Sequence, residues 1–213
     1  MLKEQMEKIY RTLPTDKIPW NLEAVPDILQ DIVKTESIKP CKVIELGCGV
    51  GTYVRYFSSK GFDATGVDFS DSALALARDS ALKKGAHCRF IAADVLGEMT
   101  EVQDTFDFAY DWELLHHIFP QDRERYIHTV YQLLNPGGHY LSVCFSEEDP
   151  RFGGTEKYRK TSLDTLLYVS SEDEIENLVK PLFEIKEIKT VDIKGKGGFH
   201  TAIYAFLRKR EDN

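Results

Sequence analysis

The apolar residues of this chain follow two periods that alternate along most of its length. Short, nearly continuous apolar runs predict buried parallel strands at 43–46, 63–68, 88–93, 106–111 and 139–145. Between them, apolar residues three or four positions apart predict helices at 52–60, 72–84 and 121–134. This alternation is typical of an α/β protein with a doubly wound, mostly parallel sheet and helices on both faces.

The two ends of the chain follow other patterns. Helices are predicted at 1–12 and about 25–37, joined by a connector that contains two prolines. The segment 147–165 has no clear period and is predicted to be a long loop. After a helix opened by a capping-box pattern, two strand-like runs joined by a glycine-rich link predict an antiparallel hairpin, at 183–193 and 199–207.

Composition narrows the class of protein further. The 213 residues carry a net charge of −8, which argues against a general nucleic-acid binder, since that would need a basic face. No apolar run approaches the roughly 20 residues that span a bilayer. The four cysteines form no CxxC pair, and we find no signal peptide, so we expect reduced thiols and a cytoplasmic protein.

The chemistry concentrates at the end of the first predicted strand. There Gly47, Gly49 and Gly51 follow the apolar run at alternate positions and predict a sharp turn into a helix. Glycines permit backbone conformations that other residues avoid, and they let a ligand approach the main chain closely. The N-terminus of the following helix would direct its amides and dipole at that ligand.

Acidic residues end the next three strands, each followed by an apolar residue. Ligands of open α/β sheets bind at the carboxyl ends of the strands, so these positions are informative. An acid after the second strand can accept both hydroxyls of a ribose, and one after the third can accept an adenine amine. The pairs are Asp68 with Phe69, Asp94 with Val95, and Asp111 with Trp112. They suit an adenosine ligand.

The glycine spacing helps to distinguish between the classes of cofactor that contain adenosine. A dinucleotide fingerprint needs G-x-G-x-x-G, whereas this chain has G-x-G-x-G preceded by Glu45. A carboxylate in that position would repel a pyrophosphate and favour a cationic group, such as a sulfonium or an α-amino group. A nicotinamide oxidoreductase is therefore disfavoured.

Five motifs in order resemble those of the class I S-adenosylmethionine-dependent methyltransferases. They are Glu45–Gly51, Val67–Ser70, Ala93–Val95, Phe106–Asp111 and Leu134–Gly138. The resemblance implies a Rossmann-like, doubly wound seven-stranded sheet with an antiparallel last strand, and S-adenosyl-L-methionine as cofactor. It also implies a single methyltransferase domain over 1–213, divided into a helical cover (1–40), a cofactor-binding core (41–146) and a loop, helix and hairpin (147–213).

Carried over position by position, the resemblance gives a set of expected cofactor contacts. A Pro-Trp segment at residues 19–20 is similar to the cover found in thiol, halide and tellurite methyltransferases, which points to a small-molecule acceptor. The expected cofactor-binding residues are Trp20, Glu45, Gly47, Cys48, Gly49, Gly51, Asp68, Phe69, Asp94, Val95, Asp111 and Trp112.

The catalytic group remains open at this stage. His116 is a candidate base and Trp112 a candidate neighbour of the reactive methyl. The favoured alternative for the His116–His117 pair is that one ring packs against the sheet and the other faces solvent. No metal site is expected, because adjacent histidines project differently and no third ligand has suitable spacing. A non-catalytic cofactor- or partner-binding module is the alternative function. The methyl acceptor and the oligomeric state are not specified by the sequence.

Overall fold

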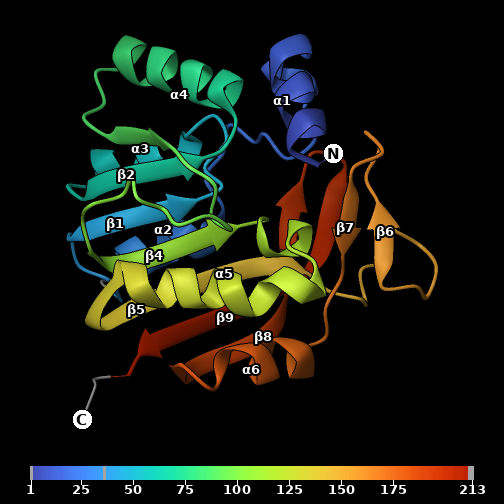
Figure 1. Ribbon diagram of the computed structural model, residues 1–213. Coiled ribbons are helices and arrows are strands. Elements are labelled where there is room, and N and C mark those ends of the chain that lie inside the picture. The colour runs from blue at the N-terminus through green and yellow to red at the C-terminus, as the bar shows by residue number, and fades with distance from the viewer. Residues whose placement is uncertain (1, 36, 211–213) are drawn as a thin grey trace.

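The computed structural model describes residues 2–35 and 37–210, and seven strands within these ranges form one sheet (Figure 1). Its strands are β1 (Lys42–Leu46), β2 (Asp63–Asp68), β3 (Arg89–Ala92), β4 (Phe106–Trp112), β5 (Leu134–Phe145), β8 (Phe183–Gly195) and β9 (Gly198–Lys209). The order is β3-β2-β1-β4-β5-β9-β8. Neighbours from β3 to β5 are parallel, and β9 is antiparallel to both β5 and β8. The predicted fold class, including the antiparallel last strand, is confirmed.

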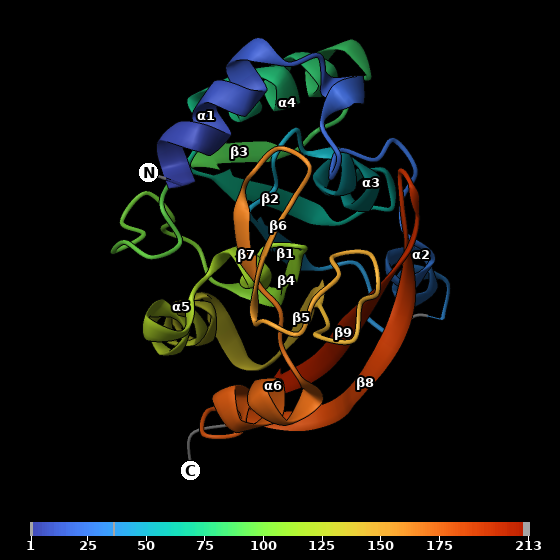
Figure 2. The same ribbon diagram turned by 90° about the vertical axis from the view of Figure 1, so that its right-hand side faces the viewer.

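Helices cover both faces of this sheet (Figure 2). They are α1 (Leu2–Thr12), α2 (Asp27–Lys34), α3 (Thr52–Ser59), α4 (Asp71–Lys83), α5 (Pro120–Leu133) and α6 (Glu172–Val179), with short 3-10 turns η1 (Thr15–Lys17) and η2 (Leu115–His117). Alternate residues of β4 face opposite sides, as the pleat of a strand requires. Phe108 and Tyr110 pack in the cluster that contains α2 and α3, whereas Ala109 packs in the cluster that contains α5 and α6.

The strand order reverses between β1 and β4. β2 and β3 lie to one side of β1, while β5, β9 and β8 lie on the other side of β4. At such a switch point the connections leave in opposite directions, and a crevice opens outside the carboxyl ends of the strands. The glycine turn after β1 therefore stands at the mouth of this crevice.

Two segments differ from their sequence-based predictions. The Asn135–Gly138 segment, which separates the predicted helix at 121–134 from the predicted strand at 139–145, lies within β5, and the register with β4 shifts between Phe106 and Phe108. The predicted loop at 147–165 contains β6 (Tyr158–Lys160), which pairs with β7 (Leu166–Tyr168). Leu167 and Val169 are buried at alternate positions, but this pattern is too short to stand out from the charged residues around it.

No helix in the described ranges is long and apolar enough to cross a membrane. The α1 helix and the connector that follows it instead lie over the carboxyl-terminal edge of the sheet, next to α4 (Figure 2). This N-terminal segment forms the cover of the site described next.

Candidate functional site

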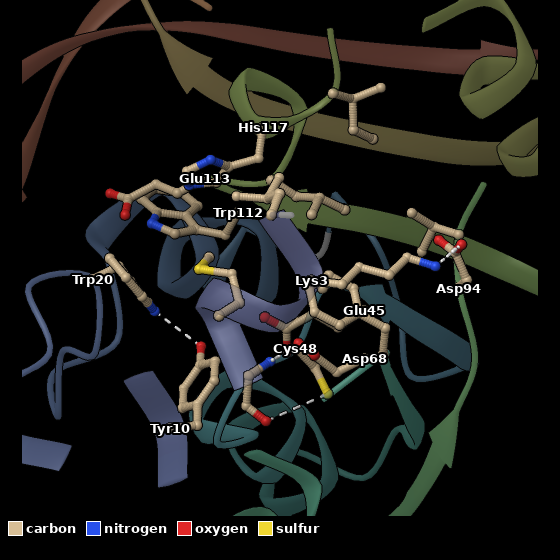
Figure 3. A pocket seen from close by; sticks show the side chains of 18 of the residues that line it. Lys3, Tyr10, Trp20, Glu45, Cys48, Asp68, Asp94, Trp112, Glu113 and His117 are labelled. Carbon is tan, nitrogen blue, oxygen red and sulfur yellow. Dashed lines mark hydrogen bonds and ion pairs between the residues drawn. The ribbon is translucent and has the colours of Figure 1, made fainter. Parts of the chain in front are cut away.

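A cavity of about 580 Å³ lies at the carboxyl ends of β1, β2 and β4, beneath the N-terminal segment (Figure 3). Most residues predicted from the sequence line it. They are Trp20, Glu45, Gly47, Cys48, Gly49, Asp68, Phe69, Asp94, Val95 and Trp112. Cavities of this size and largely apolar lining accommodate cofactors and small ligands.

The glycine turn leaves the main chain open on the cavity side. Gly47 and Gly49 have φ values of 72° and 50°, a region that residues with a Cβ rarely adopt. A Cβ on Gly47 would lie 2.8 Å from a methyl carbon of Leu114, and one on Gly49 would lie 2.7 Å from the Tyr10 hydroxyl. Side chains at these positions would fill the space in which a ligand can approach the backbone.

Asp68 connects this turn to β2. Its Oδ2 accepts the Gly49 amide at 2.8 Å, and its Oδ1 accepts the Ser70 amide at 2.9 Å. Burial raises the pKa of Asp68, and the two amides oppose that shift. A carboxylate has about four acceptor sites, so a carboxylate fixed in this way can still accept two ribose hydroxyls.

Asp94 lies at the other end of the cavity, after β3. Its Oδ1 accepts the Leu96 amide at 3.1 Å, and its Oδ2 pairs with Lys3 from α1. The Lys3 ammonium also lies 5.9 Å from the centre of the Phe69 ring. The two residues expected at the adenine end are therefore already in contact with the covering helix.

Glu7 holds α1 in place over the site. Its carboxylate accepts the Ser70 hydroxyl at 2.6 Å and the Ser72 hydroxyl at 2.5 Å. These two hydroxyls lower the pKa of Glu7. Because both serines belong to the start of α4, Glu7 links the cover directly to the loop that follows Asp68.

Glu45 faces the cavity from inside the sheet. It is 3% exposed, and its Oε2 accepts the Tyr110 hydroxyl at 3.0 Å. Burial raises the pKa of Glu45 well above its usual range, while the Tyr110 hydroxyl acts in the opposite direction. A cationic group beside Glu45 would restore its ionised form, which suits the amino group of a methionine moiety.

Aromatic rings close the cavity opposite the glycine turn. The indole N–H of Trp20 donates to the Tyr10 hydroxyl at 2.9 Å, and the Trp20 ring meets the His117 ring edge to face at 6.5 Å between centres. Trp112 and Tyr53 make a similar contact at 6.1 Å. The Trp112 indole nitrogen is buried without a hydrogen-bond partner in the described residues, so it is a donor that a ligand could use.

Two of the predicted cofactor contacts are not among the residues that line this cavity. Asp111 is fully buried and does not line the cavity, because its carboxylate accepts the hydroxyls of Tyr126, Tyr140 and Ser142. Gly51 begins α3 with a φ of 68° and packs against the Phe90 ring. Both residues therefore pack against protein groups next to the cavity. The position of Asp111 at a strand end was not sufficient evidence of a ligand contact.

The histidine candidate also changes. His116 is 2% exposed, stacks on Phe145 at 4.2 Å between ring centres, and does not line the cavity. His117 does line it. Its Nδ1 lies 3.2 Å from the Leu166 carbonyl oxygen, which can only accept, so Nδ1 carries the proton and Nε2 has the free lone pair. Burial lowers the pKa of His117 to about 4, so this ring is neutral at pH 7.

Glu113 is a lining residue that the sequence reasoning missed. It follows Trp112 directly and has a φ of 61°, an uncommon value for a residue with a side chain. Its position in the sequence, two residues after Asp111 at the end of a predicted strand, could have indicated that it lies at the cavity. Within the described ranges, no group of three or more His, Cys, Asp or Glu residues is placed to hold a metal ion.

The fold and this cavity together define an enzyme-like, Rossmann-type protein that binds an adenosine-containing ligand. Comparison with known proteins supports this class. Residues 43–138 match the family model described as "Methyltransferase domain". Among solved structures, the 1,6-didemethyltoxoflavin-N1-methyltransferase of Burkholderia thailandensis, which contains bound S-adenosylhomocysteine, has a TM-score of 0.75 at 23% identity. That alignment covers 99% of this chain and 88% of the other.

Curated relatives give the same result at the level of sequence. A ubiquinone biosynthesis O-methyltransferase of Photorhabdus laumondii is 31% identical over 46% of this chain and 40% of its own length. Thiocyanate methyltransferase 1 of Arabidopsis thaliana is 25% identical over 70% of this chain and 66% of its own length. The matched part thus spans less than two thirds of either relative. Over residues 43–138 the chain is thus similar to methyltransferase domains, and both of these relatives are named as methyltransferases.

Proposed function

We propose that this protein transfers a methyl group from S-adenosylmethionine to a small-molecule acceptor. The observation that carries the proposal is the convergence, in one covered cavity, of an open glycine turn with carboxylates in the last residues of β1 and β2 and after β3. In that cavity, Asp68 is the proposed partner of the ribose and Asp94 with Val95 of the adenine. Gly47 and Gly49 leave room for the methionine part, and Glu45 is the proposed partner of its amino group.

The bound cofactor supplies a methyl group already activated by the positive charge on its sulfur. The protein therefore has to bind both molecules, align the acceptor atom with the methyl carbon, and keep water away. Oriented reactions of this kind gain about 7–11 kcal/mol from positioning alone. Trp20 and Trp112 are placed to enclose the reacting atoms, and α1 shields the cavity from solvent.

The shape and charge of the site favour a small acceptor. The cavity is covered by the N-terminal segment, and its lining contains more acids than bases. Neither feature suits a nucleic acid, whose phosphates need a basic surface. The names of the two curated relatives, which refer to ubiquinone biosynthesis and to thiocyanate, also support a small molecule.

We propose further that residues 1–213 form a single domain with the three parts expected from the sequence. Cys41, Cys48, Cys88 and Cys144 are all free thiols in the structure, which supports a reducing, cytoplasmic environment.

The test of the proposed function is an assay with fractionated acceptors. The protein is incubated with S-adenosylmethionine and a cell extract that has been separated by ultrafiltration into small molecules and macromolecules. We expect S-adenosylhomocysteine to form with the small-molecule fraction. Formation with the macromolecular fraction alone would contradict the small-molecule acceptor. Binding of the cofactor product without turnover on either fraction would favour a non-catalytic module.

A further inference from the structure

The cavity has an excess of acidic side chains beyond those proposed for the cofactor. In the described part of the chain, its charged lining consists of one lysine, Lys3, and six acids. Lys3 already pairs with Asp94. With Glu45, Asp68 and Asp94 set aside for the cofactor, three acids remain: Glu4, Glu113 and Asp122. Asp122 is paired with Arg125 on α5 at 2.5 Å.

Of these three acids, Glu113 is the one that directly follows Trp112, the residue proposed to flank the reactive methyl, and both residues line the cavity. Its left-handed backbone (φ 61°) is held by a 2.8 Å hydrogen bond from its amide to the Val143 carbonyl. Such a conformation is unfavourable for a residue with a Cβ, and it persists where surrounding structure imposes it, often at functional sites. The Glu113 carboxylate makes no ion pair with any residue that the structure describes.

The neighbours of Glu113 supply no positive charge. Tyr53 from α3 and Trp112 from β4 face it, and both are neutral, as is His117 from η2 at pH 7. Burial raises the pKa of Glu113 to about 7. The carboxylate is therefore poised to gain or lose a proton near neutral pH.

His117 adds a second acceptor on this side of the cavity. Its Nδ1–H is directed at the Leu166 carbonyl, so the free Nε2 lone pair can accept a hydrogen bond from a ligand. The Trp20 ring meets the same histidine ring in an edge-to-face contact. Figure 3 shows His117, Glu113 and Trp112 grouped together beside Trp20.

Building on the proposed function, we propose that the methyl acceptor is an amine, which binds as its ammonium ion against Glu113 and gives its proton to that carboxylate. Among the described lining residues, an anionic acceptor such as a thiolate, carboxylate or thiocyanate would meet carboxylates and lone pairs, and the one lysine is already paired. An ammonium ion would instead meet the Glu113 carboxylate and the Nε2 lone pair of His117, which both accept hydrogen bonds. The proton must leave, because a protonated amine has no lone pair for the attack and would also repel the sulfonium.

The proposed reaction is balanced by three changes. The ammonium N–H bond breaks, and its proton passes to a Glu113 oxygen. The nitrogen lone pair then forms a bond to the methyl carbon as the carbon–sulfur bond breaks, with the electron pair of that bond staying on sulfur. The products are S-adenosylhomocysteine and the methylated ammonium ion, and Glu113 releases its proton to solvent when the cavity opens.

The binding test uses two aromatic probes of similar size and opposite charge. Protein saturated with S-adenosylhomocysteine is titrated by calorimetry with 2-phenylethylamine and, separately, with 3-phenylpropanoate. We expect the amine to bind at least about tenfold more tightly than the carboxylate. Glu113→Gln is expected to remove most of this preference and to leave the affinity for S-adenosylhomocysteine within about threefold of wild type. Glu98→Gln, at an exposed position, is the matched control and should retain the preference.

A kinetic readout separates the base from a merely structural residue. With an amine acceptor, we expect the kcat/KM of the wild-type protein to rise with pH through about 7, because the free enzyme binds the ammonium ion and accepts its proton only when Glu113 is ionised. Glu113→Gln should lose this rise along with most of kcat.

Equal or tighter binding of 3-phenylpropanoate, absence of amine binding, or methyl transfer to thiocyanate but not to amines would overturn the amine assignment. The proposed function fails separately, if S-adenosylhomocysteine does not bind or if no small molecule is methylated.

Discussion

Asp111→Ala is expected to lower the free energy of unfolding by about 3–5 kcal/mol, measured by urea denaturation. The Asp111 carboxylate is fully buried and accepts hydroxyls from Tyr126 on α5 at 3.0 Å, from Ser142 on β5 at 3.1 Å, and from Tyr140. Removing it leaves three buried hydroxyls without an acceptor, and each unsatisfied group costs about 1–3 kcal/mol before the surroundings relax.

A graded series makes this stability prediction robust. Asp111→Asn keeps one acceptor oxygen and should lose less stability, so it provides a measurable variant if the alanine protein fails to fold. Asp79→Ala removes an exposed acid paired with Lys83 on the same helix and should change stability by less than about 0.5 kcal/mol. If Asp111→Ala stayed within about 1 kcal/mol of wild type, the account of Asp111 as a core acceptor would be incorrect.

Asp68→Ala is expected to weaken binding of S-adenosylhomocysteine by about 100-fold. A carboxylate that accepts two ribose hydroxyls makes two charge-assisted hydrogen bonds of about 1.5–3 kcal/mol each, and each 1.4 kcal/mol corresponds to about a tenfold change in affinity. Asp68 also fixes the Gly49 amide at 2.8 Å, so its loss would loosen the glycine turn as well.

The matched control for Asp68 lies at the start of the same strand. Asp63 is exposed, and Asp63→Ala should leave the affinity for S-adenosylhomocysteine unchanged within about twofold. Circular dichroism of both variants shows whether the fold is retained. A folded Asp68→Ala protein that binds within about fivefold of wild type would rule out Asp68 as the ribose partner.

The parts of the fold that could be predicted from sequence are those with long, regular patterns. The runs at β1, β2, β4 and β5 are nearly continuous in apolar residues, since both faces of a parallel sheet are buried. The antiparallel hairpin followed from the glycines between β8 and β9. The β6–β7 ribbon was missed, because three-residue strands are too short to have a readable period.

The sequence could predict only those site residues whose position follows from lying at the carboxyl end of a strand. Position along the strand placed Asp68 and Asp94 correctly at the cavity, and the same rule misplaced Asp111. Asp111 differs from Asp68 and Asp94 in the groups that contact its carboxylate. Two of those groups, the hydroxyls of Tyr126 and Tyr140, come from later elements of the chain, so the local sequence does not reveal them. Likewise, only the three-dimensional contacts distinguish His117, which faces the cavity, from His116, which stacks on Phe145.

The central claim is that the cavity after β1 binds S-adenosylmethionine. The most direct measurement is calorimetric titration of the wild-type protein with S-adenosylhomocysteine and, at the same concentration, with NAD. We predict saturable one-to-one binding of S-adenosylhomocysteine and no binding of NAD, because Glu45 and the G-x-G-x-G turn disfavour a pyrophosphate. Absence of saturable binding of S-adenosylhomocysteine up to about 1 mM, or preferential binding of NAD, would contradict the account.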